Sequence, residues 1–130
     1  MDPINMSLRI LVVDDNDLMR AGLCVLLQEH LGWHICGEAA GGADAIQKSL
    51  QLKPDVILVD VSMPDMNGFQ VARRIHDQLP NSAILIVTEH DSCSFDNIEP
   101  QPGVRGYIMK SRASSDLVPA VEAACSLSLA

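Results

Sequence analysis

Polar side chains that could do chemistry together come directly after four short apolar runs of the sequence. Asp14 and Asp15 follow the first run, Asp60 the second, Thr88 the third and Lys110 the fourth. The carboxyl ends of parallel strands meet at one edge of a sheet, where ligands bind. If the apolar runs are parallel strands, these side chains meet in one crevice although they are far apart in the chain.

Three carboxylates in one crevice repel one another unless a cation joins them. A ligand set of oxygens alone, without Cys or His, suits Mg²⁺, which keeps several waters and shares its shell with phosphate oxygens. The three carboxylates, one Mg²⁺ and the Lys110 ammonium together carry no net charge. Asp60 is the best-placed nucleophile and would form an aspartyl phosphate, while Mg²⁺, Lys110 and the Thr88 hydroxyl would bind the phosphoryl oxygens.

The apolar runs themselves are predicted strands. Each is rich in Val, Ile and Leu and lacks polar alternation, which is typical of parallel strands buried on both faces. The runs span residues 10–13, 56–59, 83–87 and 107–109, and a weaker fifth spans 34–36.

Segments with helical spacing alternate with these strands. Their apolar stripes are, in chain order, Leu18, Ala21, Val25 and Leu26; Ala43, Ile46 and Leu50; Val71, Ile75 and Leu79; and Leu117, Val121, Ala124 and Cys125. Asn16 or Asp17 can cap the first helix and Ser114 the last. Strands that alternate with helices predict an α/β domain with a parallel sheet and helices on both faces.

The segment 92–102 is atypical for a helix of such a domain. Only Phe95 and Ile98 offer apolar anchors there, and Pro100 and Pro102 prevent a longer helix. We therefore expect a short or distorted element between the last two strands.

The amino-acid composition and net charge exclude several classes of protein. The 130 residues are 48% hydrophobic and carry a net charge of −8, which suits one globular domain and excludes a disordered chain. The negative charge repels phosphate backbones, so this domain alone is not expected to contact nucleic acid.

No run approaches the roughly 18 apolar residues of a membrane span. Residues 1–7 lack a secretory signal, so we expect a cytoplasmic protein with a loose leader and one domain over 8–130.

Four sequence motifs occur together here, namely LVVDDND, VILVDVSMPDMNGF, ILIVTEH and GYIMKS. With them, the chain from about residue 8 onward resembles a response-regulator receiver domain of two-component signalling. The phrases GEAAGGADAI and RGYIMKS are most similar to the NarL/FixJ branch. The resemblance implies a three-layer, doubly wound (βα)5 flavodoxin-like fold with sheet order 2-1-3-4-5.

The resemblance also implies a role for each site residue. Asp60 would accept a phosphoryl group from a sensor histidine kinase or phosphotransfer protein. Mg²⁺ would be held by Asp14, Asp15, Asp60 and the backbone carbonyl of Ser62, Lys110 would bind the phosphoryl group, and Thr88 and Tyr107 would form the switch. The only chemistry implied is phosphotransfer to the domain itself and its autodephosphorylation. The output would be a partner, or a homodimer formed on phosphorylation.

Two departures from the family pattern keep alternatives open. Glu89 stands where the family commonly has a small residue, and its carboxylate could repel a phosphoryl donor; with the atypical 92–102 region this favours a pseudo-receiver that only binds partners. A haloacid-dehalogenase-type phosphatase needs an acid two residues after its nucleophile, where this chain has Ser62. The NarL/FixJ branch usually carries a C-terminal helix-turn-helix, so the chain is either a stand-alone receiver or the input piece of a transcription regulator.

Overall fold

The computed structural model describes residues 8–89 and 101–129, with the side chains of the last helix described as far as residue 125. The leader over residues 1–7 and most of the atypical segment 92–102 therefore lie outside the described residues.

A five-stranded sheet forms the centre of the domain, and all of its neighbouring strands run parallel. The strands are β1 (Leu8–Val13), β2 (Trp33–Ala39), β3 (Val56–Asp60), β4 (Ala83–Thr88) and β5 (Val104–Met109). Their order in the sheet is β2-β1-β3-β4-β5, which confirms the predicted doubly wound topology. Every predicted apolar run lies inside one of these strands.

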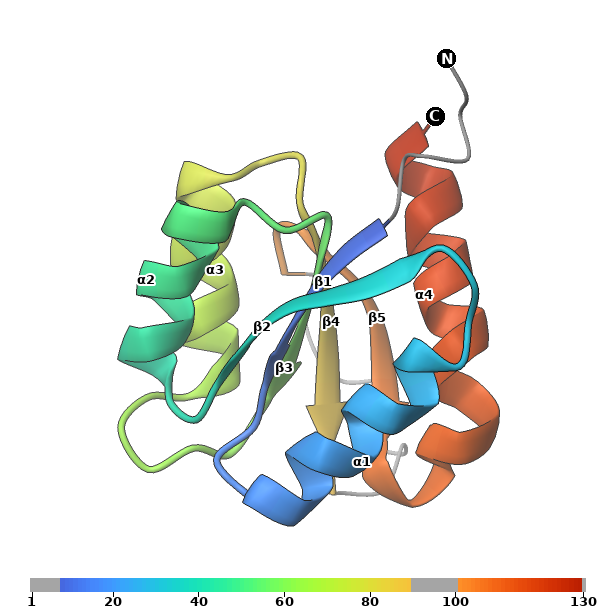
Figure 1. The fold of residues 1–130 in the computed structure, drawn as a ribbon. Helices are drawn as coiled ribbons and strands as arrows, with labels where there is room; N and C mark the ends of the chain where they lie inside the picture. Colours follow the sequence, from blue (N-terminus) through green and yellow to red (C-terminus); the bar gives the residue numbers. More distant parts are fainter. Residues whose placement is uncertain (1–7, 90–100, 130) are drawn as a thin grey trace.

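Helices cover both faces of the sheet, as Figure 1 shows. They are α1 (Asp17–Gln28), α2 (Gly42–Leu52), α3 (Gly68–Gln78) and α4 (Ala113–Leu129), and a short 3-10 turn (Lys110–Arg112) precedes α4. α1 and α4 pack on one face, and α2 and α3 pack on the other. None of the helices in the described ranges is long and apolar enough to cross a membrane.

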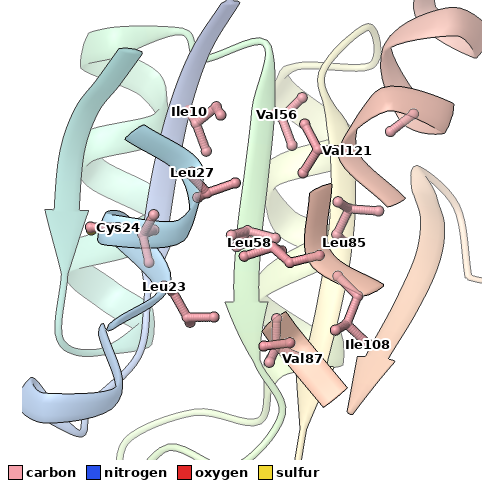
Figure 2. Close-up of a cluster of buried hydrophobic side chains, with 14 of the residues drawn as sticks. Ile10, Leu23, Cys24, Leu27, Val56, Leu58, Leu85, Val87, Ile108 and Val121 are labelled. Carbon is pink, nitrogen blue, oxygen red and sulfur yellow. The ribbon is translucent and has the colours of Figure 1, made fainter. Parts of the chain in front are cut away.

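Successive strand residues point to opposite faces of the sheet and so build two separate cores. Ile10 and Val12 of β1 join the core beneath α1 and α4, whereas Leu11 and Val13 join the core beneath α2 and α3. Figure 2 shows the first of these cores, where Leu58 and Leu85 meet side chains of α1 and α4. Burial on both faces explains the unbroken apolar runs of β1, β3 and β4, whereas β2 and β5, at the two edges of the sheet, also carry polar residues.

The predicted buried face of α1 was correct only at Leu26, which packs against the core. The helix buries Leu23, Cys24 and Leu27, while Leu18 is 84% exposed and Val25 is 56% exposed. Because α1 is apolar on most of its circumference, spacing alone allows more than one face to pack. The face that packs also places Arg20 beside β2, where its guanidinium binds Glu38.

The predicted face of α2 was correct only at Ile46, which packs against the core, whereas that of α3 was confirmed. α2 buries the small residues Gly42, Ala45 and Ser49, and Leu50 remains 42% exposed. The reason is close packing at Gly42, where an added Cβ would lie 2.6 Å from the Cβ of Met66. The same Cβ would lie 2.9 Å from Cγ2 of Val71 in α3, so a larger side chain at this position would push the two helices apart.

Capping residues agree with the sequence at one helix and differ at another. The side chain of Asn16 accepts a hydrogen bond from the backbone N–H of Met19 and caps α1, as predicted. Ser114 was predicted to cap the last helix, but α4 begins one residue earlier at Ala113, so that prediction was wrong. The 3-10 turn after β5 continues directly into α4 and leaves Ser114 inside the first turn.

Candidate functional site

The ends of β1, β3, β4 and β5 bring the polar residues together at one edge of the sheet. Asp14, Asp60 and Thr88 are buried, and the Lys110 side chain is only 9% exposed. Lys110 Nζ lies 3.1 Å from Asp14 Oδ2 and 3.3 Å from Asp60 Oδ1. Thr88 ends β4 one position after Val87, which is the partner of Asp60 in the sheet register. The side chains of Asp14, Asp60 and Lys110 therefore meet as predicted, with the ammonium between two buried carboxylates.

Asp14 is fixed by contacts on both its main chain and its side chain. Its N–H donates to the carbonyl of Ala39 at 3.0 Å, and its Oδ1 accepts from the N–H of Asn16 at 2.9 Å. Its backbone carbonyl accepts from Nη1 of Arg20 at 2.7 Å. The acidic residue at the end of β1 is thus held in one orientation.

Burial and a like charge set the protonation of Asp60. Removal from water and the neighbouring Asp14 carboxylate raise the pKa of Asp60 to about 6, although Lys110 and the N–H of Ser62 oppose the shift. The Ser62 N–H lies 3.4 Å from Asp60 Oδ1. Burial lowers the pKa of Lys110, but the two carboxylates outweigh it and hold that pKa above its usual value. Near neutral pH the site therefore holds an ionised Asp60 beside a charged lysine.

The three carboxylates fit a divalent cation. One oxygen from each of Asp14, Asp15 and Asp60 lies within 4.8 Å of the others. Asp14 Oδ2 is buried, and no hydrogen-bond donor in the described part of the chain is aligned with it, although the Lys110 charge is near. Hard oxygen ligands with one exposed member match the preference of Mg²⁺ for a few carboxylates and several waters. The role of the Ser62 carbonyl as a ligand stays a prediction.

The loop after Asp60 is anchored by a residue that the sequence analysis missed. Asp65 accepts hydrogen bonds from the N–H groups of Gly42 at 2.9 Å and Ala43 at 3.1 Å, and so caps α2. These two bonds hold the pKa of the Asp65 carboxyl below its usual value. The only signal in the sequence is that Gly41, at the cap position, has no side chain to do this. The partner lies 23 residues away and carries no local signature.

Gly68 fixes the other end of the same loop. Its N–H donates to the carbonyl of Val61 at 2.8 Å, and an added Cβ would lie 2.4 Å from the backbone oxygen of Asp60. Asn67 and Gln70 form a capping box at the start of α3. The main chain from Asp60 to α3 is consequently held at several points.

Glu89 lies at the exposed rim of this cluster of charged side chains. Its carboxylate is 75% exposed and reaches within 3.6 Å of Lys110 Nζ. The lysine therefore faces a third carboxylate in addition to Asp14 and Asp60. That the Glu89 carboxylate repels a phosphoryl donor stays a prediction.

Tyr107 is half-buried in β5 on the face that carries α2 and α3. Its ring lies 6.5 Å from that of Phe69, measured between centroids, at an angle of 49°. Burial raises the pKa of its hydroxyl. The switch roles of Tyr107 and Thr88 stay predictions.

Comparison with known proteins identifies this arrangement. Residues 10–122 match the response regulator receiver domain family. The chain is 34% identical over 114 residues to the response regulator GacA of Pseudomonas viridiflava, covering 88% of this chain and 53% of that protein. It therefore spans about half the length of the curated relatives it matches.

Two solved structures agree with both fold and family. A LuxR-family two-component response regulator from Aurantimonas sp. SI85-9A1 has a TM-score of 0.83 and 31% identity, covering 90% of this chain and 84% of that one. The signal receiver domain of the putative response regulator NarL from Mycobacterium tuberculosis has a TM-score of 0.77 and 32% identity, covering 91% and 96%.

This chain belongs to the response regulator receiver domain family of two-component signalling. Its relatives include LuxR-family and NarL regulators, which agrees with the predicted NarL/FixJ branch. Neither the phosphatase nor the pseudo-receiver alternative is favoured by these matches.

Proposed function

We propose that Asp60 accepts a phosphoryl group from the phosphohistidine of a sensor kinase or a phosphotransfer protein. An Asp60 oxygen forms a bond to phosphorus while the P–N bond to the donor imidazole breaks, and the imidazole keeps the electron pair. With a pKa of about 6, Asp60 is mostly ionised near pH 7, as a nucleophile must be. The observation that carries the proposal is the Lys110 ammonium, which lies 3.1 Å from Asp14 Oδ2 and 3.3 Å from Asp60 Oδ1.

The surrounding residues have complementary roles in this proposal. Asp14, Asp15, Asp60 and the Ser62 carbonyl hold Mg²⁺, which neutralises charge on the phosphoryl oxygens when bound. Lys110 supplies a further positive charge to those oxygens, and the Thr88 hydroxyl donates a hydrogen bond to them. Tyr107 then changes its packing near Phe69, and the altered surface is read by a partner or by a second copy of the chain.

The wider setting follows from the relatives. A LuxR-family regulator among the similar structures supports a role as the input part of a cytoplasmic transcription regulator, with residues 8–130 as the receiver unit. The 130-residue chain carries a net charge of −8, so in this proposal the receiver unit leaves any DNA contact to another part of such a regulator.

The test of this function is phosphorylation by a small donor. Wild type incubated with Mg²⁺ and acetyl phosphate or phosphoramidate should gain one phosphoryl mass by intact mass spectrometry. Asp60→Asn should gain none, whereas Asp77→Asn, at an exposed position of α3, should behave like wild type. Wild type that stays unmodified would favour a pseudo-receiver, and modified Asp60→Asn would place the acceptor elsewhere. Rapid turnover of small phosphate esters would favour the phosphatase.

A second prediction concerns the rim carboxylate. Glu89→Ala should be phosphorylated faster than wild type by small donors, by about threefold to tenfold, because one negative charge is removed beside Lys110. Glu89→Gln keeps the size and removes the charge, so it should show most of the same gain. The measurement is the initial rate of phosphoprotein formation at low ionic strength. Unchanged or slower rates in both variants would mean that Glu89 does not repel the donor.

A further inference from the structure

Arg20 of α1 lies outside the proposed phosphorylation chemistry, yet it is bound to the segment that carries the acidic pair. Its side chain is only 17% exposed. Nη1 donates to the backbone oxygen of Asp14 at 2.7 Å, Nε to Glu38 Oε1 at 3.0 Å and Nη2 to Asp17 Oδ1 at 2.8 Å. One guanidinium thus joins the end of β1, the neighbouring strand β2 and the first turn of α1.

The contact with Asp14 acts on a particular peptide group. The Asp14 carbonyl lies in the same rigid plane as the N–H of Asp15. The hydrogen bond from Arg20 therefore sets the direction in which the chain leaves β1 toward Asp15. The Asp14 N–H is already bound to Ala39, so the residue is held from both sides. Without Arg20, the peptide group between Asp14 and Asp15 would lose the hydrogen bond that holds its carbonyl.

The two carboxylate partners orient the guanidinium for this task. Glu38 and Asp17 bind Nε and Nη2 and leave Nη1 aimed at the Asp14 carbonyl. A planar guanidinium has several donors in fixed directions, whereas a lysine ammonium is a single point with a different reach. A lysine at position 20 would keep the positive charge but could not form the three directed hydrogen bonds. The Arg20→Lys variant therefore tests whether the geometry of the guanidinium matters beyond its charge.

We propose that Arg20 is a positioning residue for the metal site, which orients the Asp14–Asp15 peptide so that both carboxylates are ready to bind Mg²⁺. Partners behind metal ligands commonly change metal affinity by about tenfold to a hundredfold when they are removed. The inference rests on the proposed function, because it assigns Mg²⁺ to Asp14, Asp15 and Asp60.

The experiment compares Mg²⁺ binding by isothermal titration calorimetry in four versions of the 130-residue chain: wild type, Arg20→Lys, Arg20→Gln and Arg112→Gln. Arg112 is a matched control, because it also pairs with a carboxylate, Asp116 at 3.2 Å, but no contact with the acidic pair is described for it. Both Arg20 variants should bind Mg²⁺ about tenfold more weakly than wild type, and Arg112→Gln should stay within about twofold. Urea unfolding of each protein checks that all four are folded.

The Mg²⁺ dependence of the phosphorylation rate distinguishes a role of Arg20 in positioning the metal ligands from a general loss of structure. In phosphorylation by acetyl phosphate, the Mg²⁺ concentration at half-maximal rate should rise about tenfold in Arg20→Lys, while the rate at saturating Mg²⁺ stays within about twofold. If Arg20→Gln is unfolded, Arg20→Lys and Glu38→Gln, which removes an orienting partner, still decide the question. Glu38→Gln should weaken Mg²⁺ binding in the same direction.

The outcomes against this inference are distinct from failure of the proposed function. Wild-type affinity in Arg20→Lys would show that charge rather than geometry matters and would overturn the proposal. So would equal weakening in Arg112→Gln. A wild type that binds Mg²⁺ and is phosphorylated on Asp60 but is insensitive to Arg20 would overturn this inference alone. A wild type that binds no Mg²⁺ would overturn the proposed function as well.

Discussion

Asp60→Asn is expected to make the metal-free protein more stable than wild type above pH 6, although the same change removes the proposed phosphoacceptor. The folded-state pKa of Asp60 is raised from 3.8 to about 6, chiefly by burial and then by Asp14. Between about pH 4 and 6 the unfolded chain has lost this proton while the folded protein keeps it. The wild type therefore loses stability as the pH rises through that window, and the loss is complete above it.

The size of the effect follows from the shift. At about 1.4 kcal/mol for each pKa unit, the ionised Asp60 costs the fold up to about 3 kcal/mol at pH 8. Asparagine has no charge to bury, and Lys110 keeps its contact with Asp14. The difference in the free energy of unfolding between wild type and Asp60→Asn should be smallest near pH 4 and largest at pH 8.

Urea unfolding at pH 4, 6 and 8 with a chelator measures this prediction. Asp77→Asn, at an exposed position of α3, controls for the change of one charge and should track wild type. Adding Mg²⁺ should stabilise wild type more than Asp60→Asn and narrow or reverse the gap. Equal stability of the two proteins at pH 8 without metal would show that the Asp60 carboxylate is not strained by its surroundings.

Gly68→Ala is expected to cost roughly 3 kcal/mol of stability or more, as overpacking against the main chain does. The new Cβ would lie 2.4 Å from the backbone oxygen of Asp60 and 2.8 Å from Cα of Val61. Neither atom is the end of a flexible side chain, so the end of β3 or the start of α3 must move. Because the displaced atoms belong to Asp60 itself, phosphorylation should slow as well.

Gly22→Ala is the control for this prediction. Gly22 lies in α1, and an added Cβ there meets nothing within 4 Å. Alanine in an open helical position should raise stability by about 0.5 to 1 kcal/mol. Urea unfolding of both variants gives the two free energies. Gly68→Ala with wild-type stability would mean that the loop after Asp60 adjusts freely.

The sheet and the meeting of the site residues could be predicted from the sequence, because each rests on a local pattern. A buried parallel strand is apolar throughout, and a polar residue directly after it must lie at the carboxyl edge. Asp14, Asp60 and Lys110 meet for this reason alone. The strand β2 was only weakly indicated, since it lies at the edge of the sheet and mixes buried with exposed residues.

Contacts between distant segments could not be predicted in the same way. The buried face of α1 depends on which of several apolar faces meets the sheet, and nothing within the helix decides between them. Arg20 reaches Glu38, 18 residues away, and Asp65 reaches Gly42, 23 residues away. Such partners follow from how the strands and helices are placed, which a local pattern does not contain.

The Asp65 carboxylate links the loop after β3 to the beginning of α2. It belongs to the segment that follows the proposed phosphoacceptor, but it satisfies two amide groups at the beginning of α2. Displacing that segment must either carry the beginning of α2 along or exchange these two hydrogen bonds for bonds to water. A chemical event at the end of one strand is thereby tied to the position of a helix that contains none of the reacting groups.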